Sequence, residues 1–236
     1  MTHPLVVSYY TPGTAYEDKA RQLAGDLRRL GLRGRIEPIA SRGSWVENCA
    51  MKAGFIRRVW REQGGPILWL DADARLRRPL RELDGETADL AVVRRRGWSF
   101  YTGQIFFGPG PGAGLLLDRW CAYCEASPQV WDQVSLGYSW WDGALDGTLQ
   151  TRWLDERVFE RRSRKPWEAL AQKLLGRRPI LQLQESRRSK PTLARSPVPE
   201  FGNDRVPQWW RDAAARDAPF ALDAARRREL GLLPAA

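Results

Sequence analysis

Apolar and polar positions in the first part of the chain alternate in blocks that predict strands and helices in turn. The run PLVVSYY at residues 4–10 is rich in β-branched and aromatic side chains, which is typical of a strand. After the turn-prone TPGT, apolar residues recur at Ala20, Leu23 and Leu27, which is the spacing of one helix face. Gly31 then indicates where this helix ends.

The same pattern repeats further along. Residues 34–40 predict a short second strand. A helix follows, with Ser44 as its N-cap, Glu47 three residues later in the capping-box position, and Gly64 at its end. PILWL at residues 66–70 predicts a strand that is buried on both faces. This alternation predicts an α/β fold, in which crossover connections build a mixed, mainly parallel sheet flanked by helices.

The rest of the chain continues this domain and then changes character. Four further elements are expected, two strands and two helices, at residues 88–96, 102–108, 112–127 and 130–141. From Thr151 onward the periodicity weakens, although PILQLQ at 179–184 predicts one more strand and residues 207–233 predict one or two amphipathic helices. We therefore expect one α/β domain over residues 1–195 and a helical tail over 196–236 that packs on it.

An acidic pair follows the strand at 66–70. Asp71 and Asp73 are separated by Ala72 and come directly after ILWL. Ligands of parallel sheets gather at the carboxyl ends of the strands, where this pair is expected to lie. Two adjacent carboxylates suit a hard divalent cation, Mn²⁺ or Mg²⁺, which can neutralise a departing diphosphate. The alternative is a pair of solvated carboxylates at a strand end.

The charge of the chain adds a second signal. Lys and Arg number 38 against 28 Asp and Glu, which gives a net charge of +10. Between Arg152 and Arg195 there are 13 basic and 5 acidic residues, so most of the excess lies in one segment. Such a segment attracts a polyanion, whether a diphosphate, a nucleic acid or an acidic membrane surface. Because there is no run of about 18 apolar residues and no leader pattern, we expect a soluble, cytoplasmic protein.

The cysteines predict no special chemistry. Cys121 and Cys124 form WCAYC, but they fall inside a predicted helix rather than at a strand-to-helix junction, as a redox motif requires. A structural zinc site needs about four ligands, and only Cys49 and His3 are available besides this pair. We expect reduced thiols.

Six segments together resemble the nucleotide-diphospho-sugar transferases of the GT-A fold. They are SYYTPGTAY, WVENCAMKAGFIRRVW, ILWLDADARL, FYTGQIFFGPGPGAGLLLDRW, WDQVSL and ILQLQESRRSK, which cover roughly residues 5–190 in the order that this family shows. The resemblance implies a glycosyltransferase, a DxD metal motif at Asp71 and Asp73, and a nucleotide-sugar donor, with UDP favoured. The sequence departs from the pattern of this family at one position. Many members supply a third metal ligand from a C-terminal histidine, which is missing here, so Gln182, Gln184, Glu185 or water is expected to replace it.

The resemblance also implies donor-binding residues. Tyr9 and Tyr16 are candidates for stacking on the base, with a place in the core as the alternative. The basic residues near the C-terminal end are candidates for binding the phosphates, with an exposed basic loop as the alternative. The full set of candidates is Tyr9, Thr11, Tyr16, Asn48, Lys52, Asp71, Gly103, Gln104, Arg187, Arg188 and Lys190.

On the acceptor side, Asp132 is the candidate base for the acceptor hydroxyl. Its alternative is a carboxylate that favours a helix N-terminus. Gln133 is expected to face the acceptor. The chain has 12 tryptophans, and Trp98, Trp140 and Trp141 are candidates for a platform that stacks a sugar or an unstacked base.

The identity of the acceptor stays open. The positive charge and the tryptophans fit DNA that carries a 5-hydroxymethylated pyrimidine, as in the DNA-glucosylating relatives of this fold, with the base turned out of the stack. Proteins, glycans and lipid-linked sugars are alternatives. A catalytically inactive nucleic-acid-binding module is a further hypothesis, whereas a nuclease or phosphatase requires metal ligands that the sequence does not offer.

Overall fold

The computed structural model describes residues 3–43, 45–95, 99–126, 132–161, 167 and 178–183. Its larger elements are β1 (Leu5–Tyr10), α1 (Ala15–Leu30), β2 (Gly34–Pro38), α2 (Trp45–Gln63), β3 (Ile67–Leu70), β5 (Leu90–Arg95), β6 (Ser99–Phe107), α3 (Pro111–Ala126) and α4 (Asp132–Leu145). Its shorter elements are the strands β4 (Ala74–Leu76), β7 (Thr151–Trp153), β8 (Phe159–Arg161) and β9 (Ile180–Gln182), and the 3₁₀ turns η1 (Arg81–Leu83) and η2 (Glu156–Val158).

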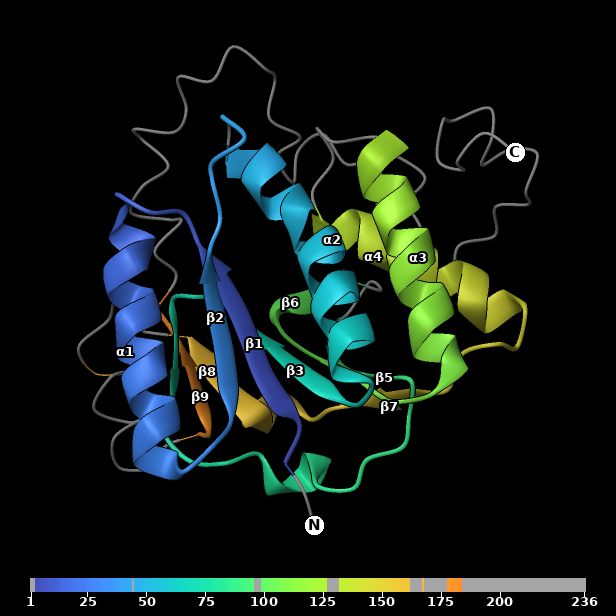
Figure 1. Cartoon of the computed structure of the whole chain (residues 1–236). Helices are drawn as coiled ribbons and strands as arrows, with labels where there is room; N and C mark the ends of the chain where they lie inside the picture. Colours follow the sequence, from blue (N-terminus) through green and yellow to red (C-terminus); the bar gives the residue numbers. More distant parts are fainter. Residues whose placement is uncertain are drawn as a thin grey trace.

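A six-stranded sheet with the order β2-β1-β3-β6-β5-β7 forms the centre of the molecule (Figure 1). Neighbouring strands are parallel in β2-β1, β1-β3 and β5-β7, and antiparallel where β6 meets β3 and β5. Only β6 therefore runs against the other strands of this sheet, within the residues that the structure describes. The carboxyl ends of β1, β3, β5 and β7 consequently meet at one edge, and we call this the C-terminal edge.

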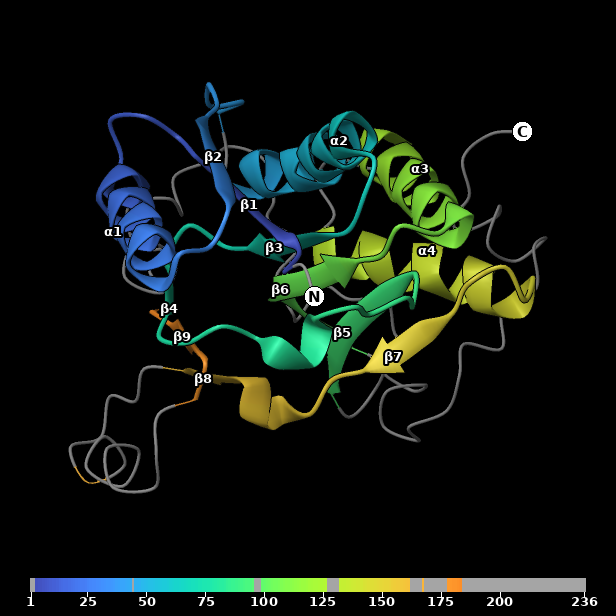
Figure 2. The same cartoon turned by 60° about the horizontal axis from the view of Figure 1, so that its bottom comes forward.

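Both faces of this sheet are covered. Side chains alternate along each strand, so Trp69 packs in the cluster beneath α2, α3 and α4 while Leu68 packs in the cluster beneath α1. A second sheet, β4-β9-β8, lies on the same face as α1 (Figure 2). Burial on both faces explains why ILWL carries no alternation of apolar and polar residues.

A buried carboxylate joins α1 to the second sheet. Asp26 on α1 is 4% exposed and accepts hydrogen bonds from Arg75 Nε at 2.7 Å and from the Leu76 amide at 3.1 Å. Burial by itself would raise the pKa of Asp26, but the hydrogen bonds and charge of Arg75, with Arg29, outweigh it and lower the pKa from 3.8. Because Arg75 and Leu76 belong to β4, these contacts hold α1 against the strand that follows Asp71 and Asp73.

The predicted fold class is confirmed. The helix predicted to end at Gly31 does so, and Gly31 has the left-handed conformation (φ 66°) of a helix C-cap. The strand predicted at 102–108 spans Ser99–Phe107. Three short strands, β4, β7 and β8, were not predicted, because three residues are too few to show a periodicity. Ser44 and the tail from 196 to 236 lie outside the described residues.

The three cysteines are free. Cys121 and Cys124 lie inside α3 and are buried, and burial raises the pKa of Cys121 to about 11. This placement agrees with reduced thiols and not with a reactive pair. None of the described helices is long and apolar enough to cross a membrane.

Candidate functional site

The acidic pair lies at the C-terminal edge, in the short turn between β3 and β4. The Asp71 amide donates to the Gly103 carbonyl of β6 at 2.9 Å, and the Ala74 amide closes the turn on the Asp71 carbonyl at 2.8 Å. Behind the turn, the Leu183 amide donates to the Asp73 carbonyl at 3.2 Å. Neighbours on both sides therefore fix this turn before any ligand binds.

Lys52 on α2 reaches into the same place. Its Nζ lies 3.2 Å from Asp71 Oδ1 and 2.7 Å from Asp132 Oδ2, with the Trp69 ring centroid 5.4 Å away. Burial by itself would lower the pKa of Lys52, but the charges of Asp132 and Asp71 outweigh it and raise the pKa well above its usual range. The side chain is therefore a buried ammonium that joins two carboxylates from different elements.

Asp71 receives a second contact from its own strand. Trp69 Nε1 donates to Asp71 Oδ1 at 3.0 Å, so the same oxygen faces both the indole and Lys52. Asp73 is 7% exposed, and burial, followed by the charges of Asp132, Asp71 and Asp73, raises the pKa of the nearby Cys49 thiol. The two carboxylates of the pair are thus held on one side of α2.

Three carboxylates meet near one ammonium at this place. Asp71 and Asp132 both contact Lys52, and Asp73 lies in the same turn as Asp71. The neighbouring Tyr9 hydroxyl and Cys49 thiol stay protonated, because burial raises both pKa values well above their usual range. Carboxylate oxygens gathered in this way suit a divalent cation.

Gly103 and Gln182 form the wall beside Asp71. Gln182 Nε2 donates to the Gly103 carbonyl at 3.0 Å and to Gln104 Oε1 at 3.3 Å. A Cβ at position 103 would stand 2.7 Å from Gln182 Nε2 and 3.3 Å from Asp71 Oδ2, so only glycine fits without a shift. The pairing of β5 with β6 also changes register between Val92 and Arg94, opposite the part of β6 that contains Gly103. Such irregularities are common next to active sites.

These donors fit a hard cation. No group of three or more His, Cys, Asp and Glu side chains able to hold a metal occurs among the described residues. Mg²⁺ and similar ions are nevertheless commonly bound by one or two carboxylates, with substrate phosphates and water as the other ligands. Of the expected replacements for the missing histidine, Gln182 is 8% exposed and lies beside the pair, whereas Gln184 and Glu185 are outside the described residues.

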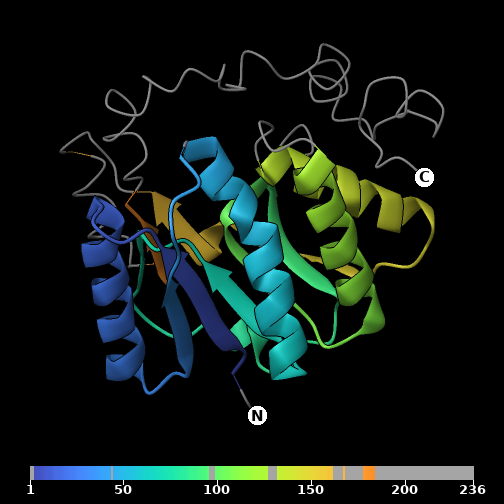
Figure 3. The same ribbon diagram turned by 45° about the horizontal axis from the view of Figure 1, so that its top comes forward.

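Tyr9 and Asn48 form the wall toward β1. The Tyr9 hydroxyl donates to the Asn48 carbonyl at 2.5 Å, and the Tyr9 ring packs on Phe55 and Trp69, each with centroids 5.3 Å away. The Asn48 side chain accepts from the Arg42 amide at 2.7 Å and so holds the loop after β2. α1 and α2 both begin at this edge (Figure 3). Of the other candidates near β1, Thr11 and Tyr16 are half-buried.

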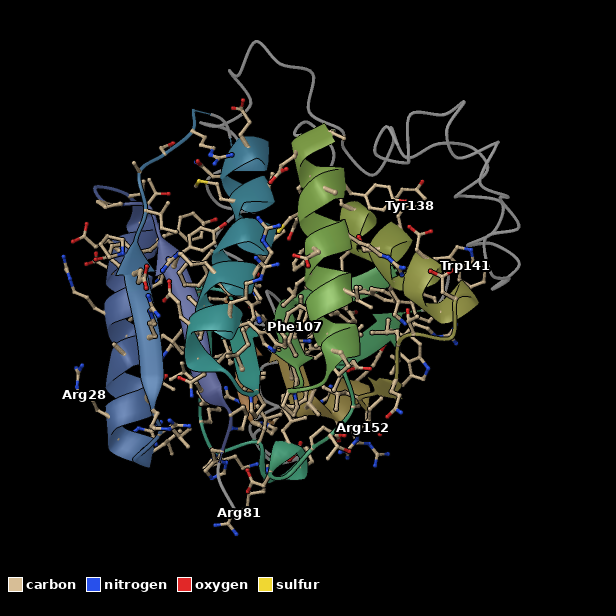
Figure 4. All side chains as sticks on the ribbon, turned by 45° about the vertical axis from the view of Figure 1, so that its right-hand side comes forward. Arg28, Arg81, Phe107, Tyr138, Trp141 and Arg152 are labelled. Atoms are coloured by element: carbon tan, nitrogen blue, oxygen red, sulfur yellow. The ribbon has the colours of Figure 1, made fainter. Side chains whose placement is uncertain are left out.

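The candidates for the acceptor side separate into two groups. Asp132 is the first residue of α4, is 6% exposed and pairs with Lys52, while Gln133 beside it is half-buried. Trp140 is 5% exposed and its Nε1 donates to Thr151 Oγ1 at 2.9 Å, a core placement that speaks against a stacking platform. Trp141 is half-buried against Trp140 and lies further along α4 (Figure 4).

Some candidates cannot be placed and one residue was missed. Four candidates fall outside the described residues: Trp98, Arg187, Arg188 and Lys190. Sequence reasoning missed Cys49 as a neighbour of the acidic pair, although its three-residue spacing from Lys52 puts both on one helix face.

The fold resembles that of solved glycosyltransferases, whereas the sequence alone matches no known family. No protein-family model and no curated protein matches the sequence. Among solved structures, a glycosyltransferase involved in the glycosylation of the major capsid of PBCV-1 is similar, with a TM-score of 0.56 at 10% identity over 77% of this chain and 93% of that chain. The chain has the GT-A glycosyltransferase fold. Mouse xyloside xylosyltransferase 1 is also similar, covering 84% of this chain and 100% of that chain at 12% identity, but its TM-score of 0.48 is too low to argue from.

Four elements of this GT-A fold contribute to the site at the C-terminal edge. The acidic pair follows β3, Lys52 lies on α2, Gly103 on β6 and Asp132 on α4. GT-A glycosyltransferases typically use a divalent metal and bind a sugar donor. The likeness extends to the fold, and the chemistry of this chain depends on its own residues.

Proposed function

We propose that this protein transfers a sugar from a nucleotide-diphosphate sugar, with UDP favoured, to an acceptor hydroxyl, with Mn²⁺ or Mg²⁺ at Asp71 and Asp73. The observation that carries the proposal is the position of Asp71 and Asp132 on either side of the buried Lys52 ammonium, with Asp73 in the same turn as Asp71, at the C-terminal edge of a GT-A fold. Carboxylates at such an edge suit a divalent cation, which one or two carboxylates commonly hold together with substrate phosphates. A cation held there would also bind the donor's diphosphate.

The chain's own residues would divide the work. Asp73 and Asp71 hold the cation, which when bound neutralises the charge that builds up on the leaving diphosphate. Trp69 and Lys52 fix the orientation of Asp71, because both contact its Oδ1. The missing Cβ of Gly103 lets the Gln182 amide and Asp71 Oδ2 lie close to β6, where they would line the donor sugar. Tyr9, Asn48 and Gln104 complete the donor side.

Asp132 remains the candidate base. Its Oδ2 is the oxygen nearest to Lys52, so Oδ1 is the candidate acceptor for the proton of the incoming hydroxyl. The buried position of Asp132 at the start of α4 keeps this carboxylate in place during the reaction. Gln133, the next residue, is proposed to contact the acceptor.

A 5-hydroxymethylated pyrimidine in DNA stays a prediction for the acceptor. The described residues contain 22 Lys and Arg against 20 Asp and Glu, a net charge of only +2. The rest of the excess belongs to residues outside the described part. Most of the charge that suggested DNA therefore lies outside the described residues.

The test is a turnover assay with several nucleotide sugars and Mn²⁺, in which release of the nucleoside diphosphate is measured with and without an acceptor. We expect Asp71→Asn and Asp73→Asn to lower turnover about a hundredfold or more. Asp118→Asn is the matched control, because Asp118 pairs with Arg61 at 2.6 Å on the surface of α3. Full turnover in the Asp71→Asn and Asp73→Asn variants would overturn the proposal.

The same assay distinguishes the acceptors. DNA with and without hydroxymethylated pyrimidines is added, and its nucleosides are analysed by mass spectrometry. A sugar on the modified DNA alone supports the DNA acceptor. Binding of DNA without any donor turnover supports instead an inactive nucleic-acid-binding module.

A further inference from the structure

The side of the molecule opposite the acidic pair carries exposed arginines from three separate segments. β1, β3, β5 and β7 begin on this side, and we call it the N-terminal edge. α1 starts at the C-terminal edge and ends here, with Arg28 in its last turn (Figure 1). Arg33 directly precedes β2, and its carbonyl accepts from the Val6 amide of β1 at 3.1 Å. Arg78 lies between β4 and η1, and Arg81 is the first residue of η1.

Contacts between the segments hold these arginines on the same side. The Arg29 guanidinium of α1 donates to the Leu76 carbonyl at 2.9 Å, so the chain leaves β4 beside the last turns of α1. Arg78 follows directly after this point, and Arg81 comes one short turn later. Figure 4 shows Arg28 and Arg81 on the lower part of the molecule, where both point away from the ribbon. The four exposed guanidinium groups therefore face solution together.

Their charge is not compensated locally. Within the described part of the chain, none of the four side chains forms a hydrogen bond or an ion pair. The nearby carboxylate of Asp84 pairs with His3. That of Glu86 pairs with Arg152. Glu82 is half-buried and is the remaining acidic side chain of this stretch. The N-terminal edge thus has a local excess of positive charge.

Unpaired guanidinium groups are well suited to phosphate, which they can bind through two parallel hydrogen bonds. Several of them on one side of a protein fit a surface that presents many phosphates. The described residues expose three large apolar side chains, Leu115, Trp153 and Trp167, and none belongs to the segments that carry these arginines. Proteins that bind single-stranded nucleic acids stack the bases on such aromatic side chains. The composition of this edge therefore favours contact with phosphates alone.

The position of the arginines favours a membrane over DNA as the partner. From Ala15, the first residue of α1, to Arg28 the helix advances by about 20 Å. DNA held at the N-terminal edge would consequently keep its bases far from Asp71. A bilayer held there would leave the C-terminal edge open to the aqueous phase, in which a nucleotide sugar is dissolved.

We propose that the N-terminal edge is a docking surface for a membrane that contains anionic phospholipids. The surface consists of Arg28, Arg33, Arg78 and Arg81. Their guanidinium groups contact lipid phosphates, and the acidic pair faces away from the bilayer. Each basic group close to such a membrane strengthens binding about fivefold, and the attraction weakens as the salt concentration rises. The inference does not depend on the proposed function, because it concerns the opposite side of the fold.

The experiment measures how the untagged full chain partitions onto sedimented lipid vesicles. The vesicles contain phosphatidylcholine alone or with about one quarter phosphatidylglycerol, at about 0.1 M salt. Two double variants each remove two charges from the docking surface: Arg28→Gln/Arg33→Gln and Arg78→Gln/Arg81→Gln. The matched control, Arg21→Gln/Arg42→Gln, removes the same charge from the first half of α1 and from the loop after β2, nearer the C-terminal edge.

We expect the wild type to bind the anionic vesicles and not those of phosphatidylcholine alone. Each double variant should lower the partition constant about tenfold or more, whereas the control should change it by less than about threefold. Thermal unfolding of each variant checks that the fold is retained. Failure of the wild type to bind anionic vesicles, or equal binding by the double variants and the wild type, overturns the inference.

A duplex oligonucleotide is the competing probe. If the double variants weaken its binding and leave vesicle binding unchanged, the surface binds nucleic acid and the inference is wrong. The proposed function is tested separately by donor turnover without vesicles, which these substitutions should leave within about twofold of the wild type, because they lie at the other edge. Vesicle binding through these arginines in a protein that never releases a nucleoside diphosphate would reject the proposed function alone.

Discussion

Lys52 Nζ lies 2.7 Å from Asp132 Oδ2, and this contact joins the middle of α2 to the first residue of α4. The side chains of both residues are less than one-tenth exposed. Buried ion pairs of this kind contribute little net stability when complete, but removing one partner leaves an uncompensated charge. The geometry of the candidate site and the packing of the two helices therefore depend on the same pair.

The first prediction concerns this pair. Lys52→Met leaves Asp132 and Asp71 without their shared ammonium, and we expect it to lower the free energy of unfolding by about 3 kcal/mol. The double variant Lys52→Met/Asp132→Asn should recover part of this loss, because one uncompensated charge is removed. Urea denaturation followed by circular dichroism measures both values.

The surface pair of Arg61 with Asp118 is the control for this prediction, since its side chains are about half exposed. Arg61→Met should cost less than about 1 kcal/mol. If Lys52→Met were as stable as the wild type, the cluster could not carry the buried charges that we assign to it.

The second prediction concerns Gly103. In Gly103→Ala the new methyl group would stand 2.7 Å from Gln182 Nε2, so the amide must move and its hydrogen bonds to Gly103 and Gln104 weaken. We expect a stability loss of only about 1 kcal/mol but a fall in donor turnover of about tenfold or more, because the sugar-facing wall is displaced. Gly65→Ala, which meets no atom within 4 Å, should leave both values near the wild type. Equal turnover in the two variants would remove Gly103 from the donor site.

The third prediction is a dependence of stability on pH. The pKa of Asp26 is lowered in the folded state by Arg75 and Arg29 despite its burial, so the ionised form stabilises the fold above the unfolded pKa. This contribution disappears as the pH falls through the folded pKa, below 3.8. Asp26→Asn should therefore cost about 2 kcal/mol at pH 7, and the difference from the wild type should shrink toward zero in strong acid. A difference that stays constant from pH 7 to pH 2 would contradict this.

The fourth prediction concerns the start of α3. A Cβ on Gly112 would lie 2.3 Å from Asp89 Oδ2 and 2.5 Å from the Thr148 carbonyl. Asp89 cannot move freely, because its carboxylate accepts from the Ala113 and Gln150 amides. Gly112→Ala should therefore lower stability by about 3 kcal/mol, as measured by thermal unfolding.

Gly54 provides the opposite case within the same fold. It is exposed inside α2 and meets no atom within 4 Å, so Gly54→Ala should raise stability by about 0.5–1 kcal/mol. A destabilised Gly54→Ala variant would mean that the backbone of α2 differs from the one described.

Much of the fold could be predicted from the sequence, because the core strands and helices are long enough to show their periods. The four residues ILWL, the helix face at Leu23 and Leu27, and the stop at Gly31 each carry a local signal that the structure reproduces. The reversed direction of β6 could not be predicted. It depends on which strands pair, and the residues of β6 look the same in either direction.

The site was predictable where its chemistry is local. Asp71 and Asp73 are only two residues apart in the sequence, so their proximity could be predicted without the fold. The contact of Lys52 with Asp132 joins residues that are far apart in the chain, and only the packing of α2 against α4 brings them together. Trp140 was expected on a surface, but α4 turns it toward Phe100 and β7, because an indole buries more apolar area than most side chains can.

The common direction of β1, β3, β5 and β7 has a practical consequence for handling the protein. β1 begins at Leu5 on the side away from the acidic pair, and in Figure 1 the amino-terminal end of the chain lies on that side. An affinity tag or a surface-immobilisation linker placed before Leu5 would project from the side opposite the C-terminal edge. Immobilised protein would therefore keep Asp71 and Asp73 accessible from the solution.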